Sequence, residues 1–384
     1  MAKKDTKANE SASQLATQKT DNAELDVIDF KAKQPLDSLS QQDIPAKRHS
    51  MRGFDPSHAD IVDYIVRITH RIWEQGDMGH IYEAYGHNCT VHTAYGLSYG
   101  IEETISSSVA FLAAFPDRRL YAEDVIWTGD DTQGFHTSHL IVNNATNFGY
   151  SPWGPPTNRK ARYLAIANCF VVANKIVEEW LVRDTAGIVR QLGLDVHEVA
   201  SKLAQNGWAA PTPETERLYG QFPPEVDVQL DRSVGGIDEV EAWVKSVLGA
   251  IWNGRHFNTV AATHSPDAMM YVPNNTILYG PNHIRTYILN LTAMFPDLGM
   301  TVEHVYTSQT PVEVTGGLPV YRVAVRWRMF GTHQNYGWLG EPTGKRANIL
   351  GVSHIHVAVE EGTPRITKHY FVFDELAVLT QLLA

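Results

Sequence analysis

Residues 100–117 read GIEETISSSVAFLAAFPD, and residues 280–297 read GPNHIRTYILNLTAMFPD. Both stretches begin with glycine and end with Phe-Pro-Asp, and both landmarks recur at one offset of 180 residues (280 − 100 and 297 − 117). Similar residues precede them, because Ile72-Trp73 is answered by Ile251-Trp252. A period of this length is too long for a solenoid unit and has the size of a whole domain. The sequence therefore predicts a tandem duplication of one small fold.

The repeats divide the 384 residues into two domains and their connections. Residues 1–50 are rich in Lys, Asp, Ser and Gln and contain one aromatic residue, Phe30. Such a segment buries too little apolar surface to offset the entropy of ordering. We expect a disordered leader over 1–50, domain 1 over 51–194, a linker over 195–235 with a short helix at about 196–205, and domain 2 over 236–384.

Each repeat begins with helical patterns and ends with strand patterns. Apolar residues three and four positions apart predict an amphipathic helix at the start of each repeat (61–72 and 240–251) and another after Gly280 (284–295). Period-two alternation predicts strands over 165–170, 176–184, 321–330, 348–356 and 367–374. Helices followed by long antiparallel strands indicate an α+β fold in each repeat.

Composition narrows the classes of partner. The formal net charge of −11 argues against a nucleic-acid surface, which needs a basic stripe. No apolar run approaches the roughly 18 residues of a membrane helix, and no apolar segment follows the N-terminal Lys3-Lys4, so we expect no membrane association and no signal peptide. Cys89 and Cys169 are too few for a disulfide framework, which favours a cytoplasmic location.

Each repeat also carries further motifs in a fixed order. The second repeat carries Arg326-Trp327, Gly331-Thr332-His333 and the run from Leu339 to Lys345, and the first ends with Trp180, Asp184 and the run from Arg190 to Gly193. Together with Phe-Pro-Asp, this series resembles the SnoaL-like (polyketide cyclase-like) branch of the NTF2-like superfamily over nearly all of 58–194 and 236–384.

The resemblance implies two cone-shaped α+β barrels, each a curved antiparallel sheet wrapped by helices around an apolar cavity. It implies cofactor-independent chemistry but does not fix a reaction, because the superfamily includes cyclases, isomerases, dehydratases, hydrolases and proteins that only bind a ligand. We expect the two sheets to pack together as an intramolecular pseudo-dimer, and further homo-oligomerisation is left open.

The acids that end the last strand of each repeat are the leading catalytic candidates. Period two places Ile176, Trp180 and Asp184 on one face of a strand, and Asp374 ends the equivalent strand. A carboxylate beside an aromatic ring in an apolar cavity has a raised pKa and can move a proton at a carbon next to a carbonyl. The resemblance also implies an Asp in this region as the acid/base. Either acid is equally suited to cap the helix that follows, and both interpretations stay open.

Histidines and one arginine are candidates for polarising a substrate. His136 and His139 lie on a strand expected to line the cavity of domain 1, on opposite faces. In domain 2 we expect His333 to act with Arg326, and the alternative in domain 1 is His136 with Asn168, the equivalent of His354. The competing interpretation is a buried side chain with satisfied ring nitrogens. Because domain 1 has Asn147 and Leu140 where domain 2 has His333 and Arg326, one half is expected to be active and the other a scaffold.

Large aromatic residues are candidates for stacking on a planar substrate, although most such residues belong to cores. The candidates are Trp73, Trp127, Trp153, Trp180, Trp327, Trp338 and Tyr370, with Trp153 and Trp338 as pocket lids. His354 and His356, with His87 and His92, are compatible with metal binding, but no helical His pair and no Cys pair supports it, so we expect no metal. No glycine-rich phosphate loop and no serine nucleophile elbow is present, and we expect no cofactor.

The sequence therefore predicts a cofactor-independent acid/base enzyme that acts on a small carbonyl-bearing molecule in an apolar cavity. The reaction would be an isomerisation, cyclisation, dehydration or hydrolysis. The alternative is a small-molecule binding protein without turnover. A pure interaction scaffold would instead have cavities filled by bulky side chains.

Overall fold

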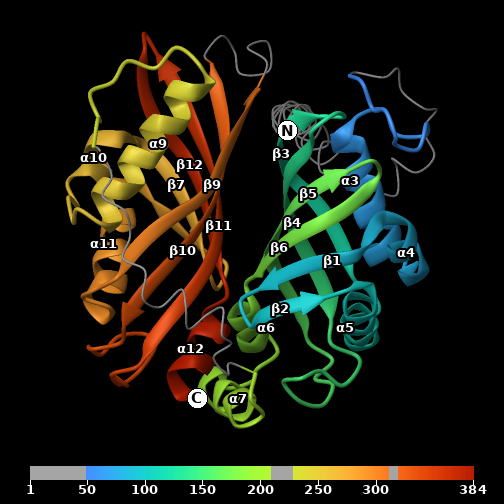
Figure 1. Ribbon diagram of the computed structural model, residues 1–384. Helices are drawn as coiled ribbons and strands as arrows, with labels where there is room; N and C mark the ends of the chain where they lie inside the picture. The colour runs from blue at the N-terminus through green and yellow to red at the C-terminus, as the bar shows by residue number, and fades with distance from the viewer. Residues whose placement is uncertain (1–48, 209–227, 311–318) are drawn as a thin grey trace, which may run out of the picture.

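The computed structural model of the chain describes residues 49–208, 228–310 and 319–384 (Figure 1). The half that contains strands β1–β6 is called domain 1, and the half that contains β7–β12 is called domain 2. The expected leader lies outside the described residues up to residue 48, as does the part of the linker over 209–227. The last two residues of the expected leader, His49 and Ser50, contact domain 1. His49 stacks on Trp127 at 4.8 Å, and Ser50 donates to Asp131 at 2.5 Å.

Domain 1 begins with helices and continues into six strands, as its periodicity predicts. Its main helices are α3 (Ile61–Thr69), which continues as a π-helical turn η2 (His70–Glu74), and α5 (Ile101–Ala114). The remaining elements are η3 (Met78–His80), α4 (Ile81–Ala84), β1 (Tyr85–Thr93), β2 (Gly96–Tyr99), β3 (Arg119–Asp130), β4 (Gly134–Thr146), β5 (Lys160–Val172), β6 (Lys175–Arg183), α6 (Thr185–Gln191) and α7 (Val196–Gln205). Helix α7 lies where the short linker helix is expected.

Domain 2 repeats this order. Its main helices are α9 (Ile237–Trp252) and α11 (Gly280–Met294), and both coincide with the predicted apolar stripes. The remaining elements are α10 (Thr259–Thr263), β7 (His264–Val272), β8 (Thr276–Tyr279), β9 (Gly299–Thr310), β10 (Val320–Thr332), β11 (Arg346–Glu360), β12 (Thr363–Phe373) and α12 (Glu375–Leu383). No helix among the described residues is both long and apolar enough to cross a membrane.

The two sheets have the same topology, which confirms the predicted α+β duplication. Their strand orders are β2-β1-β6-β5-β4-β3 and β8-β7-β12-β11-β10-β9. In each sheet the second and third strands run parallel and the other neighbours run antiparallel. The registers also correspond, since Asn168 pairs with Trp180 in domain 1 as His354 pairs with Tyr370 in domain 2. Residues of the two domains can therefore be compared position by position.

The Phe-Pro-Asp landmark has one structural role in both repeats. Proline lacks the amide hydrogen that would continue a helix, and α5 and α11 end just before it. The aspartate then closes the sheet onto the helix. Asp117 accepts hydrogen bonds from the backbone amide and the hydroxyl of Thr146, at 2.7 and 2.6 Å. Asp297 accepts the same pair from Thr332, at 2.6 and 2.7 Å.

The two sheets face each other, and the main helices cover their outer sides (Figure 1). One buried apolar cluster lies between the sheets and draws on both domains: Leu140, Ile166, Trp180, Val182, Leu350, Val352, Tyr370 and Val372. A hydrogen bond extends this interface at one edge, where the Ser308 hydroxyl accepts from the Trp127 amide at 3.0 Å. Each sheet therefore has an inner face toward its own helices and an interface toward the other domain.

A bulge in the last strand of each domain corrects one expectation. The register of β6 against β5 shifts where Phe170 pairs with Glu178 and Val171 pairs with Ile176. Ile176 therefore belongs to the inner cluster with α3, whereas Trp180 faces domain 2. Strand β12 has the same shift next to His356. The expected single face from Ile176 to Asp184 is wrong, because an extra residue in a strand reverses the alternation.

Candidate active site

The interior of domain 2, between its sheet and helices, is filled by aromatic rings. Trp327 stacks on Phe371 with ring centroids 4.6 Å apart, and Trp252 stacks on Phe371 at 5.7 Å. All three side chains are at most 2% exposed. Gly351 leaves the necessary space, because a Cβ there would lie 2.2 Å from the Trp327 ring. Trp327, a predicted substrate-stacking residue, is therefore placed in the core of domain 2, and its Nε1 donates to Ser353 at 3.0 Å.

The interior of domain 1 is open by comparison. Ala167 and Leu181 pair across β5 and β6 at the positions of Ser353 and Phe371 in domain 2. Ala167 and Leu181 retain partial exposure, whereas Ser353 and Phe371 are 1% and 0% exposed. Trp73 and Trp127, two predicted stacking residues, are likewise only partly buried where they pack against the inner cluster of domain 1. Domain 1 thus keeps accessible surface in the middle of its sheet that domain 2 has lost.

A buried acid lies on this inner face. Glu179 projects from β6 and is 5% exposed, and its Oε2 accepts a hydrogen bond of 3.0 Å from the hydroxyl of Tyr85 at the start of β1. Burial raises the pKa of Glu179 to about 7, while the Tyr85 hydrogen bond and the positive charge of Arg183 lower it. Burial also raises the pKa of Tyr85, which therefore stays protonated and remains a donor.

Domain 2 has no such acid at the equivalent position. The positions of Tyr85 and Glu179 are occupied by His264 and His369, as the pairing of Tyr85 with Ile176 and of His264 with Ile366 shows. Burial lowers the pKa of His264 to about 4 and that of His369 to about 3, so both rings are neutral near pH 7. A hydrogen-bonded tyrosine–glutamate pair in one domain is therefore matched by a neutral histidine pair in the other.

His139, predicted to be catalytic, does lie on the inner face of domain 1. It projects from β4 opposite Ala167, is 1% exposed, and has its Nδ1 3.4 Å from the hydroxyl of Thr69. Its Nε2 is buried without a hydrogen-bond partner, and burial lowers its pKa to about 3. A neutral ring with a free Nε2 can contact a bound ligand, but it does not act as a base that becomes charged near pH 7.

Several other predicted residues lie in the interface between the domains instead of in a cavity. The Arg326 guanidinium lies 3.4 Å over the Trp180 ring, and it donates to Asn168 at 3.1 Å and to Glu303 at 3.1 Å. Asn168 in turn donates to the Tyr306 hydroxyl at 2.9 Å. The cation–π contact and the hydrogen bond to Asn168 cross between the domains, and together with the bond from Nε to Glu303 they hold this guanidinium in the interface.

The predicted histidines on the interface side are also engaged across the two domains. His354 is completely buried, with Nε2 2.8 Å from the Ser138 hydroxyl and Nδ1 3.3 Å from Asp124, which also contacts His356 at 3.1 Å. His136 packs against His304 of domain 2 with ring centroids 4.4 Å apart. Tyr370 donates to Glu123 of domain 1 at 2.9 Å. These contacts place His136, His354 and Tyr370 away from the inner faces.

Asp184 and Asp374 are N-caps of α6 and α12. Asp184 accepts from the Gly187 amide at 2.9 Å, and from the Asn274 amide of domain 2 at 2.7 Å. Asp374 accepts from the Ala377 amide at 3.1 Å, and from the Thr185 hydroxyl of domain 1 at 2.5 Å. Burial raises the pKa of Asp184 to about 6 and that of Asp374 to about 7. The capping alternative is therefore confirmed, and both caps also connect the two domains.

The remaining candidates lie at the ends of the cones. His333 is completely buried and packs on Phe295 at 5.3 Å. It is seven residues from Arg326 along the chain, roughly 23 Å in an extended strand, so the two are not brought together. Trp153 packs against Phe115 at 6.0 Å, and Trp338 stacks on Tyr287 at 5.3 Å. These contacts place both tryptophans against the apolar core rather than over an opening.

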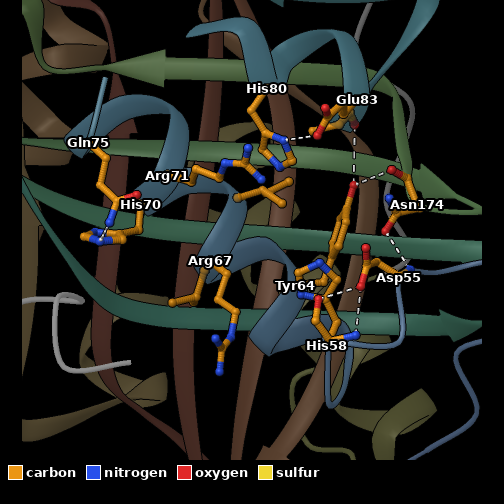
Figure 2. A pocket seen from close by; sticks show the side chains of 14 residues that line it. Asp55, His58, Tyr64, Arg67, His70, Arg71, Gln75, His80, Glu83 and Asn174 are labelled. Carbon is orange, nitrogen blue, oxygen red and sulfur yellow. Dashed lines mark hydrogen bonds and ion pairs between the residues drawn. The ribbon is translucent and has the colours of Figure 1, made fainter. Parts of the chain in front are cut away.

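A separate pocket of about 260 Å³ lies beside α3, η3 and α4 of domain 1 (Figure 2). Its charged groups already have partners. Arg71 contacts Asp77 at 2.8 Å, and Arg67 contacts Asp63 at 2.6 Å. His80 lies 2.7 Å from Glu83, a contact that Figure 2 shows. The arginines and His80 of this lining are therefore paired with carboxylates, and the His58 ring on the same lining has a buried Nδ1 without a hydrogen-bond partner. No group of three or more potential metal ligands is found within the described ranges.

The residues that sequence reasoning missed are Glu179 and Tyr85. The available signal is that Glu179 lies inside a predicted strand, directly before Trp180. Alternation places Glu179 on the face opposite to that of Trp180, the face that leads to Asp184.

Both domains match known protein families. Residues 64–192 match the family described as SnoaL-like polyketide cyclase, and residues 226–369 match the family described as SnoaL-like domain. Similar solved structures include TsrD from Streptomyces laurentii, with 16% identity over 35% of this chain and 94% of that chain and a TM-score of 0.31. IdmH from Streptomyces antibioticus has 22% identity over 35% and 98%, with a TM-score of 0.30. Among curated proteins, none matches this sequence.

Proposed function

Because the chain consists of two SnoaL-like domains in tandem, we propose that domain 1 is a cofactor-independent acid/base enzyme domain and that domain 2 is its scaffold. The observation that carries this proposal is the hydrogen-bonded pair of Tyr85 and Glu179, which is buried on the inner face of domain 1 beside the partly exposed Leu181. A carboxyl group with a pKa near 7 exists in both protonation states at neutral pH, so it can take up a proton and return it in one reaction cycle.

The proposed reaction begins at a carbon next to a carbonyl group. The C–H bond breaks, its proton moves to the Glu179 carboxylate, and the electron pair moves into the carbonyl to give an enolate. Protonated Glu179 then returns the proton to another carbon, which is an isomerisation. Alternatively, it returns the proton to the alkoxide that forms when the enolate attacks a second carbonyl in the same molecule, which is a cyclisation. Tyr85 holds the carboxylate in place, and the neutral His139 ring is available to the substrate carbonyl.

Domain 2 contributes by its shape. Its inner face is filled by Trp252, Trp327 and Phe371, and its histidine pair is neutral. The filled interior fits the scaffold expectation for that half of the molecule. Two residues of domain 2 contact the sheet of domain 1 from outside: Asp374 accepts from Thr185, and His354 contacts Asp124. These contacts support a fixed geometry for β6.

Hydrogen–deuterium exchange tests the proposal without knowledge of the product. The purified chain is incubated in D₂O with a panel of lactones, enols and oxo acids, and proton NMR follows the hydrogens next to each carbonyl. We expect at least one compound to lose this signal faster with protein than with buffer alone. If compounds raise the melting temperature of the protein but are recovered without exchange or conversion, the chain is a binding protein and the enzymatic proposal fails.

A further inference from the structure

Two guanidinium groups share one aromatic ring inside domain 1. Arg183, at the end of β6, has its Cζ 4.4 Å from the Phe111 ring centroid, and Arg118, just before β3, has its Cζ 5.3 Å away. Phe111 projects from α5 and stacks on Phe115 at 4.9 Å. All three side chains of this group retain partial exposure. The two guanidinium groups therefore lie together inside domain 1, and Arg183 is on the same strand as Glu179.

Neither guanidinium has an anionic partner. Within the described ranges, no carboxylate lies within 4.0 Å of Arg118 or Arg183, whereas Arg119, Arg190, Arg322, Arg326 and Arg328 each meet one. Arg118 donates one hydrogen bond, from Nε to Asn143 at 2.9 Å. The Nε of Arg183 is buried without a partner. Burial and the neighbouring Arg183 lower the pKa of Arg118, while Tyr163 and the Glu74 carboxylate, which makes no ion pair with Arg118, raise it. Two adjacent, half-buried guanidinium groups that repel each other and have no carboxylate in direct contact favour an anion as their partner.

Two hydroxyl groups near these cations also lack acceptors. The hydroxyls of Tyr163 and Tyr95 are buried without a hydrogen-bond partner, and Tyr163 is 0% exposed. Tyr163 lies on β5 directly opposite Asn143, the partner of Arg118. Burial and the Asp374 carboxyl raise the pKa of the Tyr95 hydroxyl, and the positive charge of Arg183 lowers it, so Tyr95 is within electrostatic range of both groups. Every unsatisfied group in this cluster can donate, which is the pattern of a site for an acceptor with negative charge.

The cluster is confined to domain 1. The registers place Phe373 at the position of Arg183 and Ile349 at that of Tyr163, and the Phe-Pro-Asp landmarks place Leu298 at that of Arg118. All three are at most 3% exposed. A cationic pair that the fold required would be expected in both copies. The domain with the Tyr85–Glu179 pair is the one that has it.

We propose that Arg118 and Arg183 bind a carboxylate of the substrate, with Tyr163 and Tyr95 as further donors, so that domain 1 acts on small oxo acids. The planar guanidinium fork matches a carboxylate with two parallel hydrogen bonds, and Phe111 provides an apolar surface for the adjoining carbon chain. This inference rests on the proposed function for its reaction, since Glu179 supplies the acid/base. The predicted binding of a carboxylate is independent of the proposed function, because it depends only on the two arginines.

Binding of oxo acids compared with their esters tests the proposal. The probes are 2-, 3- and 4-oxocarboxylates, the methyl ester of each, and inorganic phosphate, with thermal shift and calorimetric titration as readouts. We expect some acids to bind and their esters not to bind. Arg183→Met and Arg118→Met should each weaken acid binding about 10- to 100-fold, the range of a lost charge-assisted hydrogen bond. Arg71→Met, which removes an exposed arginine of the separate pocket, should leave it unchanged.

The outcomes separate this inference from the proposed function. Three results would overturn the carboxylate site. They are equal binding of acids and esters, binding of phosphate alone, and full acid binding by both Arg118→Met and Arg183→Met. Because Arg183 has no ion-pair partner and an unsatisfied Nε, unliganded Arg183→Met should melt no lower than wild type. Arg183→Lys, which keeps the charge without the fork, provides a second variant if Arg183→Met does not fold, and it should also bind acids more weakly. Acids that bind through Arg183 but never exchange in D₂O would leave the site standing and sink the enzymatic proposal.

Discussion

Tyr85 donates a 3.0 Å hydrogen bond to Glu179 across the parallel strands β1 and β6, and the same two positions of domain 2 hold His264 and His369. Duplication gave the chain two copies of one scaffold, and this pair of positions shows how the copies have diverged. One copy has a buried acid with a pKa near neutrality, and the other has two neutral histidine rings beside stacked aromatic residues. We therefore assign the chemistry to one copy and the support to the other.

Tyr85→Phe should move the pH dependence of deuterium exchange to higher pH. The base is ionised Glu179, so exchange should rise as the pH passes through about 7. The Tyr85 hydroxyl stabilises the ionised form, and a hydrogen bond to a charged group contributes about 1.5–3 kcal/mol, or about 1–2 pKa units. Its removal should raise the pKa of Glu179 by about that amount. Tyr64→Phe, whose hydroxyl donates to the Asn174 carbonyl instead, is the control and should not shift the profile. An unshifted profile for Tyr85→Phe would contradict this role.

Asp374→Asn should retain activity and gain stability, relative to wild type, as the pH rises. The pKa of Asp374 is raised to about 7 in the fold, above the value of about 3.9 for an unfolded Asp. Ionisation therefore destabilises the folded state, and wild type loses stability between about pH 4 and pH 7, whereas the variant does not titrate. Urea unfolding at about pH 5 and about pH 8 measures this difference.

Asp374→Ala is the matched control for the cap. It should cost about 1 kcal/mol of unfolding free energy, the usual value of a lost N-cap. Asp184→Asn should behave like Asp374→Asn, over a pH range that ends at about 6. A folded Asp184→Asn or Asp374→Asn protein that lost exchange more than about 100-fold would restore these acids as catalytic residues.

Trp327→Ala should destabilise the chain without changing the chemistry. Trp327 is 0% exposed and stacks on Phe371, so its truncation leaves a cavity and should cost about 3–5 kcal/mol. Denaturant unfolding measures the loss, and exchange per folded molecule should remain at the wild-type rate. A small loss of stability together with a large loss of exchange would instead indicate that domain 2 binds the substrate.

Much of the fold could be predicted because the same sequence signals occur in both repeats. Ile61, Ile65 and Ile68 mark α3 by helical spacing, and Val240, Val244 and Val247 mark α9 in the same way. The Phe-Pro-Asp landmarks are explained by Asp117 and Asp297, each of which accepts hydrogen bonds from the equivalent threonine of its repeat. Landmarks of this kind are local, since each depends on a few neighbouring residues.

The site could be predicted only in part, because both faces of its strands are buried. Strand β6 presents Glu179 to the interior of domain 1 and Trp180 to domain 2, and both side chains are less than a tenth exposed. Alternation tells the two faces apart but does not say which of two apolar environments is the cavity. The bulge beside Phe170 then reverses the alternation at Ile176. Aspartates and histidines were therefore assigned to a cavity, whereas the structure places most of them between the domains.

The central claim is that one acid in one domain carries the reaction, and exchange by a matched pair of variants tests it most directly. Glu179→Gln replaces the acid with an amide of the same shape. His369→Gln places the same side chain at the equivalent position of domain 2. We expect Glu179→Gln to fold and to lose deuterium exchange by about 10²–10⁴, the usual contribution of a general base, while His369→Gln exchanges at the wild-type rate. Full exchange by folded Glu179→Gln, or its loss in His369→Gln alone, would contradict the account.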